Sequence, residues 1–472
     1  MFLGRKSELA VLQQEFDKAG FSFSVIYGRR RVGKTTLIRE FIKDKSAIYF
    51  QATISSEKDN LENFSRAIGL FEGKGIDAAY SFADFRSLFD NISSLAKEKP
   101  LVLVIDEFPY LAKSFSEISS ILQYYIDHIW QENTGLHLIL AGSSMSFMEH
   151  QVLGYESPLY GRKTSQIKVL PFTFQETLTF FPTVTGEEAL VYYAITGGIP
   201  LYLSYMDATR SVAENLLNTF LNKNSAIFEE PYNLLQQELR NPASYSAILT
   251  AIAGGASKQN EIATKSGIST SLAAKQIEIL IELGIVEKKM PVGEMSKKLG
   301  IYIIKDGLFR FWYRFIAKNM SYIELNHPNE LLKYILQYLP NFLASVFEDI
   351  SREWVTYQMK QGNIPIVYGK LGSWWGTNKK TKRQEEMDVC GFDISEENIL
   401  LGECKWKNTN IDLAVLQVLL QRGEDLFSWQ NKAYFAFSKT DYSDEAKKFA
   451  QEHDIQLITF QQMVNDFRQE KA

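Results

Sequence analysis

The strongest constraint on the fold is the stretch FSFSVIYGRRRVGKTTLIREFI at residues 21–42. An apolar run typical of a β-strand leads through a glycine-bounded turn into a helical pattern, and the centre fits G-x-x-x-x-G-K-[ST]. The glycines let the backbone curl so that successive amide groups and the first turn of the helix face phosphate oxygens. We therefore predict a strand, a phosphate-binding loop and a helix, with the loop formed by Gly28, Arg29, Arg30, Arg31, Val32, Gly33, Lys34, Thr35 and Thr36.

The lysine and the first threonine of this loop have separate predicted roles. Lys34 would reach the β- and γ-phosphate oxygens, and the Thr35 hydroxyl would ligate Mg²⁺. ATP and Mg²⁺ are therefore the expected cofactors. A glycine-rich basic turn that binds no ligand is the alternative.

Two further apolar runs end in polar residues, as strands of a parallel sheet do where they meet a ligand. EKPLVLVIDEFPYL leads to Asp106, which would hold the Mg²⁺ shell, and to Glu107, which would polarise the attacking water. GLHLILAGSSMSFM ends in serines, and Ser143 or Ser144 would contact the γ-phosphate from a neighbouring strand. Ordinary solvated strand ends are the alternative in both cases.

These motifs resemble those of AAA+ and STAND ATPases with an additional central strand, and more closely those of the archaeal-type ATPase family. The further matches are FLGRKSELAVL at the start, GSS after the third strand, PLYGRKTSQIKVLPFTFQE (158–176) and TGGIPLYL (196–203). The resemblance implies that Arg162 is an arginine finger, supplied within the subunit or from a neighbour in a homo-oligomer. It also implies that Pro200 packs near the adenine. A surface arginine and an ordinary helix-ending turn are the alternatives.

Residues 240–305 combine helical patterns with a short β-like pair, which is typical of a winged helix-turn-helix. The recognition helix is expected at 270–283, with Ser269 or Thr270 as its cap. Its exposed face carries acidic residues as well as one lysine, and the acids would repel phosphates. An internal packing module and direct reading of a DNA duplex both stay open.

The stretch MDVCGFDISEENILLGECKW predicts two strands that place charges among apolar residues. If the strands turn around residues 395–396, Asp388 falls opposite Glu403, and Lys405 lies alongside. Since buried charges are costly without compensation, Asp388 and Glu403 would bind Mg²⁺, and Lys405 would orient or deprotonate the attacking water in phosphodiester hydrolysis. A structural ion pair, or a nuclease fold that binds without cutting, is the alternative.

This pattern resembles the PD-(D/E)XK nuclease superfamily, to which the C-terminal domain of the archaeal-type ATPases has been related. The resemblance implies an additional acid at Glu348 on the preceding helix and a supporting polar residue at Gln417 on the following one. The basic residues of 379–383 would contact a phosphate backbone, so DNA is the expected polymer. In the same register Cys390 lies on the metal face and Cys404 on the opposite one, which argues against a disulfide between them.

Length and composition set the remaining expectations. The chain has 472 residues, 45% of them hydrophobic, and a net charge of −5, which suits a folded chain of about three domains of ~150 residues each. Without a signal-like segment or an apolar run of ~20 residues, a cytoplasmic location and no membrane partner are expected. We divide the chain into 1–180 (P-loop ATPase core), 181–238 (helical lid), 239–318 (winged helix) and 319–472 (nuclease-like domain).

The expected fold is an α/β P-loop domain with a parallel sheet, then an all-α and winged-helix segment, then a C-terminal α/β domain like that of restriction endonucleases. The expected function is ATP hydrolysis whose nucleotide state controls a Mg²⁺-dependent nuclease-like domain acting on DNA. The alternative is a STAND-like switch, in which exchange of ADP and ATP rearranges the winged helix and the C-terminal domain binds nucleic acid or protein without cutting.

Overall fold

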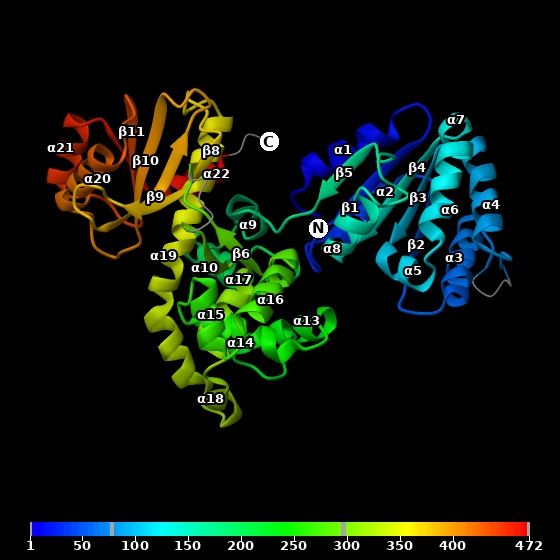
Figure 1. The fold of residues 1–472 in the computed structure, drawn as a ribbon, viewed down its shortest axis with the longest axis horizontal. Helices are drawn as coiled ribbons and strands as arrows, with labels where there is room; N and C mark the ends of the chain where they lie inside the picture. The colour runs from blue at the N-terminus through cyan, green and yellow to red at the C-terminus, as the bar shows by residue number, and fades with distance from the viewer. Residues whose placement is uncertain (1, 76–79, 294–298, 470–472) are drawn as a thin grey trace. The chain divides into compact units, whose positions relative to one another are not determined.

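The computed structural model describes residues 2–75, 80–293 and 299–469. Its contacts divide the chain into two compact units, Met1–Pro171 with Ile199–Leu201, and Phe172–Gly198 with Tyr202–Ala472. Figure 1 shows the elements of both units, coloured along the chain. The four segments that the sequence suggests remain a prediction.

The first unit is built on a five-stranded parallel sheet in the order β2-β3-β4-β1-β5. β1, β3 and β4 are buried along their whole length, as expected for strands that are covered on both faces. β4 lies between β1 and β3 and is therefore the additional central strand that the resemblance implies. The strands are β1 (Ser22–Tyr27), β2 (Ala47–Gln51), β3 (Leu101–Asp106), β4 (Leu136–Gly142) and β5 (Ser165–Lys168).

Helices cover both faces of this sheet. On one face α1 and α2 contribute Leu12 and Leu37 to a core that includes Ile26 of β1. On the other face Phe64 of α3 and Phe89 of α4 belong to a larger apolar core, and Figure 1 shows these helices beside the sheet. The helices are α1 (Lys6–Phe16), α2 (Lys34–Ile42), α3 (Glu57–Phe71), α4 (Phe85–Glu98), α5 (Phe108–Ser114), α6 (Ile118–Tyr125), α7 (Gln131–Asn133) and α8 (Met145–Phe147), with π-helical turns η1 (Ile126–Trp130) and η2 (Met148–Val152).

The second unit starts with helices and continues into three helices followed by a two-stranded antiparallel ribbon, β6 (Val286–Lys289) and β7 (Ile301–Ile304). This order is the one expected for a winged helix. The predicted recognition helix is α16, with Ser269 at its N-cap, where the Ser269 side chain accepts no capping hydrogen bond. The helices are α9 (Phe174–Phe180), α10 (Gly186–Thr196), α12 (Val212–Asn218), α13 (Glu230–Glu238), α14 (Pro242–Ala253), α15 (Gln259–Ser266) and α16 (Thr270–Glu282). The short helix α11 (Pro200–Leu203) begins in the segment assigned to the first unit and ends in the second.

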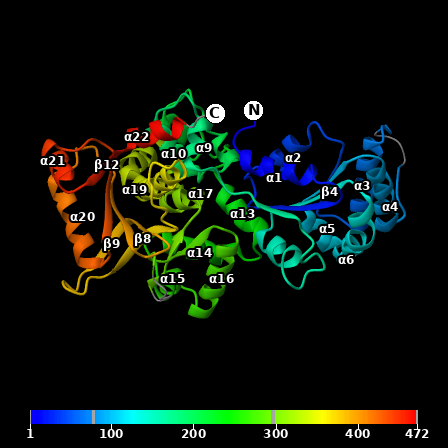
Figure 2. The same ribbon diagram turned by 90° about the horizontal axis from the view of Figure 1, so that it is seen from above.

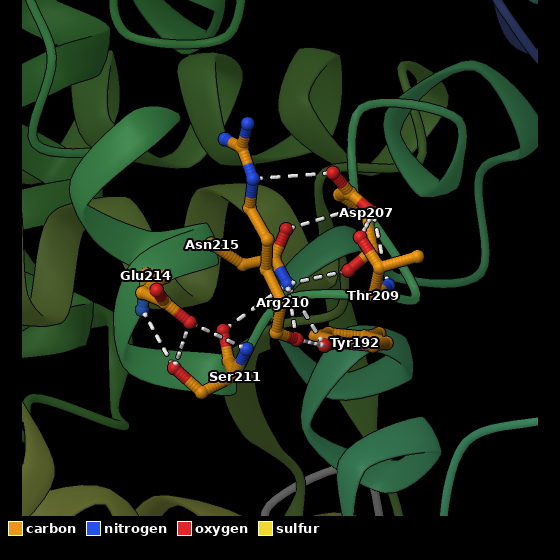
Figure 3. A network of polar contacts seen from close by, with 7 residues as sticks. All are labelled: Tyr192, Asp207, Thr209, Arg210, Ser211, Glu214 and Asn215. Carbon is orange, nitrogen blue, oxygen red and sulfur yellow. Dashed lines mark hydrogen bonds and ion pairs between the residues drawn. The ribbon is translucent and has the colours of Figure 1, made fainter.

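A buried polar network ties α12 to α10 (Figure 3). The Asn215 side-chain amide lies within hydrogen-bonding distance of the Tyr192 hydroxyl at 2.9 Å and of the Asp207 carbonyl at 2.9 Å. The Asn215 side-chain oxygen accepts from the Asp207 backbone amide at 2.8 Å. Because Asn215 is only 2% exposed, these protein groups take the place of water for it.

The C-terminal part of the second unit is a five-stranded mixed sheet in the order β12-β11-β10-β9-β8. β8, β9 and β10 pair antiparallel, whereas β10, β11 and β12 pair parallel. α20 and α21 pack on one face, and Figure 2 shows them beside the strands of this sheet. Phe347 of α19 packs against Trp406, which follows β10. The elements are α17 (Gly307–Phe311), η4 (Trp312–Ile316), α18 (Met320–Glu324), α19 (Pro328–Lys360), β8 (Lys370–Thr377), β9 (Gln384–Phe392), β10 (Asn398–Lys405), α20 (Leu413–Leu426), β11 (Asn431–Ser438), α21 (Asp444–Glu452), β12 (Ile455–Thr459) and α22 (Phe460–Arg468).

The long helix α19 carries a half-buried carboxylate that caps another helix. Glu353 accepts hydrogen bonds from the backbone amides of Phe174 at 3.1 Å and Gln175 at 3.0 Å, in the first turn of α9. The first amides of a helix have no acceptor within it, so the Glu353 carboxylate supplies their acceptor. The negative charge of Glu353 also interacts favourably with the positive end of the α9 dipole. Burial raises the pKa of Glu353, and the two amide hydrogen bonds counteract that rise.

The predicted fold class is confirmed in its main divisions: a parallel-sheet α/β domain, a helical segment and a C-terminal domain that contains a sheet. In the portions of the chain that the structure describes, no helix combines the length and the apolar character needed to cross a lipid bilayer.

Candidate functional site

The phosphate-binding loop leaves β1 at Gly28 and enters α2 at Lys34. Gly28 has a φ of 154°, and a Cβ built there would lie 2.3 Å from the Val169 carbonyl oxygen. Arg31 and Gly33 also have positive φ values, 72° and 92°. The backbone therefore curls as predicted, and Gly28 is required because another chain segment passes directly against it.

Lys34 and Thr35 face the loop and the neighbouring strand. The Lys34 ammonium donates to the carbonyls of Gly28 at 2.9 Å and Arg29 at 3.0 Å, and the side chain is buried. The Thr35 hydroxyl donates to the Asp106 carboxylate at 2.9 Å. The structure thus places Asp106, at the end of β3, beside Lys34 and Thr35, which come from a distant part of the sequence.

Asp106 sits at the end of β3 and is almost completely buried. It accepts from the Tyr49 hydroxyl at 2.7 Å as well as from Thr35. Burial, together with the nearby Asp106 charge, raises the pKa of Tyr49, so the tyrosine stays protonated and remains a donor. Sequence reasoning missed Tyr49, which comes from the neighbouring edge strand β2.

Glu107 follows Asp106 with a φ of 51°. Its carboxylate accepts from the Ser143 hydroxyl at 2.9 Å and from the Ser143 amide at 3.3 Å. The predicted serine therefore contacts the predicted water-polarising acid, whereas Ser144 takes the N-cap of the short helix α8.

The remaining loop residues have different environments. Val32 is buried in the core beneath the sheet, and Thr36 is exposed. The Arg30 guanidinium donates to the Tyr110 hydroxyl at 2.5 Å. Arg5, from the matched N-terminal motif, donates to the Val32 carbonyl at 3.2 Å and so ties that motif to the loop.

Arg162 is held inside the first unit. Its guanidinium makes a two-pronged ion pair with Asp127 of η1, with N–O distances of 2.7 and 2.6 Å. The same guanidinium donates to the Pro158 carbonyl at 2.9 Å. The hydrogen bonds from Arg162 lower the pKa of Asp127, so the pair is charged near neutral pH.

Pro200 begins α11, two residues after the glycine pair of TGGIPLYL. Gly197 ends α10 with a φ of 66°, and a Cβ on Gly198 would lie 2.2 Å from the Phe172 carbonyl oxygen. The glycines are thus required by close packing of the backbone. The placement of Pro200 near an adenine remains a prediction.

The β9–β10 hairpin has the predicted register. Leu401 pairs with Cys390 and Gly402 with Val389, which places Glu403 beside Asp388. The Asp388 carboxylate accepts from the Cys404 amide at 2.8 Å. Both cysteines are free, as the predicted register requires.

Glu403 is the centre of a charged cluster in this hairpin. One carboxylate oxygen pairs with the Lys405 ammonium, and the other accepts from the Arg422 guanidinium at 3.1 Å. Arg422 of α20 also donates to Glu385 of β9 at 3.0 Å. Sequence reasoning missed Arg422 and named Gln417 instead, which is exposed on the same helix.

The acids of this cluster are poorly solvated. Burial and the neighbouring Glu403 charge raise the pKa of Asp388 to about 6. Burial and the Asp388 charge raise the pKa of Glu348, on α19, to about 7, although Arg352 and Lys289 counteract the rise. Burial opposes the charged form of Lys405, but the pairing with Glu403 outweighs it and raises the Lys405 pKa. Lys405 is therefore a cation at neutral pH, which favours orienting a water over deprotonating it.

A cavity of about 550 Å³ opens beside this cluster. Its lining includes Asp388, Glu348 and Arg422, and also Lys289 and Ile301 from the β6–β7 ribbon. Two of the predicted acids, Asp388 and Glu348, therefore border a space large enough for part of a ligand, whereas Glu403 and Lys405 are not part of its lining. The contribution of the ribbon was not expected from the sequence.

Each site can be tested for its fit to Mg²⁺ from the oxygen donors that it presents. The Thr35 hydroxyl and the Asp106 carboxylate are in direct contact, and Asp388 and Glu403 are adjacent buried carboxylates. Nowhere in residues 2–75, 80–293 and 299–469 do three or more His, Cys, Asp or Glu side chains form a metal-binding group. Because Mg²⁺ often takes one or two carboxylates and completes its shell with water and substrate oxygens, both pairs fit the ion.

Comparison with known proteins gives consistent matches. A family described as an ATPase domain predominantly from Archaea matches residues 2–206, and a family described as archaeal and bacterial proteins of unknown function matches residues 312–415. An uncharacterized protein of Methanocaldococcus jannaschii is 33% identical over 417 residues, covering 86% of this chain and 88% of that protein. An uncharacterized ATP-binding protein of the same organism is 44% identical over 45 residues, 10% of this chain and 76% of that protein.

A solved structure shares the fold. The Walker-type ATPase of Pyrococcus abyssi superposes with a TM-score of 0.52 at 19% identity, covering 66% of this chain and 96% of that one. At this identity the likeness concerns the fold alone.

Proposed function

Since this chain belongs to the archaeal-type ATPase family and has its P-loop ATPase domain, we propose that its first unit hydrolyses ATP with Mg²⁺. We also propose that the nucleotide state controls a Mg²⁺-dependent nuclease site, formed by Asp388, Glu403 and Lys405, that acts on DNA.

Several contacts support the assignment of the ATP site. The Lys34 ammonium is bonded to loop carbonyls, so it is already held at the mouth of the loop and would turn to phosphate oxygens when nucleotide enters. Thr35 and Asp106 would hold Mg²⁺, which when bound would supply charge neutralisation on the phosphate oxygens. Glu107, oriented by Ser143, would accept a proton from the attacking water.

One observation carries the nuclease part of the proposal: two buried carboxylates and a lysine converge on adjacent strands, and one of the carboxylates, Asp388, lines a cavity. Mutual repulsion of Asp388 and Glu403 is unfavourable, as the raised pKa of Asp388 indicates, and a bound cation would relieve it. Mg²⁺ would supply Lewis acidity to a phosphodiester there. Lys405, a cation, would orient the attacking water and offset negative charge on the phosphate.

The test of the nuclease part uses the full chain with plasmid DNA, Mg²⁺ and ATP. We expect cleavage by the parent and its loss in Lys405→Ala. Lys407→Ala is the matched control, because Lys407 is an exposed lysine two residues along the chain. The nuclease proposal fails if the parent and Lys405→Ala leave the DNA equally intact with every metal and nucleotide tried.

The test of the ATP site is titration calorimetry with Mg²⁺–ATP. Lys34→Ala should abolish the binding heat, whereas Lys43→Ala, which removes an exposed lysine at the end of α2, should keep it. Equal heats for the parent and Lys34→Ala would contradict the proposed phosphate-binding role.

A second function, a STAND-like switch with slow turnover, is favoured by one contact. Arg162, the proposed arginine finger, is fully engaged by Asp127, so hydrolysis would wait for the pair to open. Asp127→Asn, which weakens the pair, should then raise turnover, and ADP should be retained tightly by the parent. Fast, DNA-stimulated hydrolysis by the parent would contradict the switch. If Arg162 acts on a neighbouring subunit, ATP should also promote homo-oligomers, which light scattering would detect.

A further inference from the structure

We propose that the β6–β7 ribbon forms one wall of the substrate site of the C-terminal domain, where Lys289 and Ser373 bind a nucleic-acid phosphate next to the Asp388–Glu403 pair. This inference rests on the nuclease function proposed above and adds the residues that hold the polymer.

The ribbon is fixed to the edge strand of the C-terminal sheet. The Val292 amide donates to the Ser373 carbonyl of β8 at 2.9 Å, and the Trp375 indole donates to the Leu299 carbonyl at 3.1 Å. A Cβ on Gly293 would lie 2.8 Å from the Phe392 ring, so the connection after β6 passes closely against β9. The edge strand β8 is therefore covered, and the end of β6 is held beside the cavity.

Lys289 is the last residue of β6 and lines the cavity together with Asp388 and Glu348. It makes no ion pair with any residue that the structure describes, whereas Arg422, the other cation of the lining, is bonded to Glu385 and Glu403. Lys289 therefore has its donors available for a ligand in the cavity. Since three N–H donors on a flexible stem suit a phosphate oxygen, its position fits a polyanion.

Ser373 gives a second, independent indication of a ligand. It lines the same cavity, is 8% exposed, and its hydroxyl has no hydrogen-bond partner in the described parts of the chain. A buried hydroxyl without a partner costs roughly 1–3 kcal/mol, so native structures seldom leave one unless a ligand or water completes it. A phosphate oxygen would accept from this hydroxyl and from Lys289 together.

The charge of the cavity makes a cation at this wall necessary for binding of a nucleic acid. Its lining has four carboxylates, Glu348, Glu385, Glu386 and Asp388, against two cations. A nucleic acid approaching the acids would be repelled unless cations held its backbone beside them. The ribbon supplies Lys289, which acts on Glu348 through its charge but, among the described residues, forms no ion pair that a phosphate would have to break.

The experiment measures DNA affinity apart from cleavage. Anisotropy of a short fluorescein-labelled DNA duplex is titrated with the full chain, with Ca²⁺ replacing Mg²⁺, between about 50 and 200 mM salt. Lys289→Ala should weaken binding by about fivefold and lower the slope of log affinity against log salt by about 1. Lys289→Arg should retain most of the affinity, and Ser373→Ala should weaken it without changing the slope.

Lys288→Ala is the matched control. Lys288 precedes Lys289 on the same strand, is exposed, and lies over the Tyr302 ring at 5.6 Å. Its loss should leave affinity and slope close to those of the parent. If Lys289→Ala and Lys288→Ala bind equally well, the inference is wrong.

Cleavage of the same duplex with Mg²⁺ is scored in parallel, so that the two proposals fail separately. A parent that cuts DNA while Lys289→Ala binds normally overturns the ribbon site but leaves the nuclease proposal standing. A parent that binds DNA through Lys289 without cutting it supports the ribbon site and overturns the nuclease proposal. A parent that does not bind the duplex overturns both.

Discussion

Replacing Asn215 with alanine should open the segment between α10 and α12 locally (Figure 3). The substitution removes the acceptor of the partly buried Asp207 amide and the donor to the Tyr192 hydroxyl or the Asp207 carbonyl. The Tyr192 hydroxyl keeps its hydrogen bond to the Arg210 carbonyl at 3.3 Å. The Asn215 amide has two hydrogens for four nearby acceptors, so it satisfies at most two at once. Each group left without a partner costs about 1–3 kcal/mol, so the loss of two such hydrogen bonds gives a total of about 3 kcal/mol.

Hydrogen exchange followed by mass spectrometry is the suitable assay, because a chain with two compact units need not unfold in one step. A loss of about 3 kcal/mol in the free energy of local opening corresponds to roughly a hundredfold faster exchange. We expect this acceleration in peptides that contain Asp207. Asn215→Asp, which keeps an acceptor but has no donor, separates the two contributions.

Asn218→Ala is the control, since Asn218 lies one helical turn further along α12 and is exposed. It should change exchange by no more than a few fold. If peptides containing Asp207 exchange at the same rate in Asn215→Ala and Asn218→Ala, the network does not stabilise this segment and the reasoning is refuted.

Two further predictions concern the first unit. Gly28→Ala should lower the free energy of unfolding by about 1–3 kcal/mol more than Gly33→Ala, because both glycines have positive φ but only Gly28 would clash, with the Val169 carbonyl; equal shifts in thermal melting would contradict this. Burial lowers the pKa of His137 to about 4. As the pH falls, the unfolded chain therefore binds a proton at this histidine before the folded chain does. The free energy of unfolding should then decrease by up to about 3 kcal/mol between about pH 6.5 and pH 4. Thermal melting at several pH values should show a smaller loss of stability at low pH in His137→Gln than in the parent. His150→Gln, a control at an exposed histidine, should lose as much stability as the parent.

The local motifs of the first unit could be predicted because each depends on neighbouring residues. The strand before Gly28, the helix from Lys34 and the buried run ending at Asp106 all follow from periodicity and glycine placement. The hairpin register at Asp388 and Glu403 was also predictable, since the turn and the alternation of side chains fix it.

Contacts between distant segments could not be predicted in the same way. Asp127 lies 35 residues before Arg162, and a single acid on a helix has no sequence signal that marks it as the partner of that arginine. Arg422 was missed because the helical pattern of α20 does not determine which polar residue turns toward Glu403. The packing of Lys289 beside the C-terminal sheet depends on how two modules meet, which periodicity within either module does not encode.

The cap that Glu353 provides to α9 constrains how this family can change in length. Glu348, which lines the cavity, and Glu353, which caps α9, are five positions apart on α19. Both follow Pro340, so no proline lies between them, and the helix fixes the angle between their side chains around its axis. Inserting or deleting one residue between them would rotate one carboxylate by about 100° relative to the other. Relatives that retain both acids should therefore gain or lose residues in the connections that flank this helix, while the interval between the two acids stays constant.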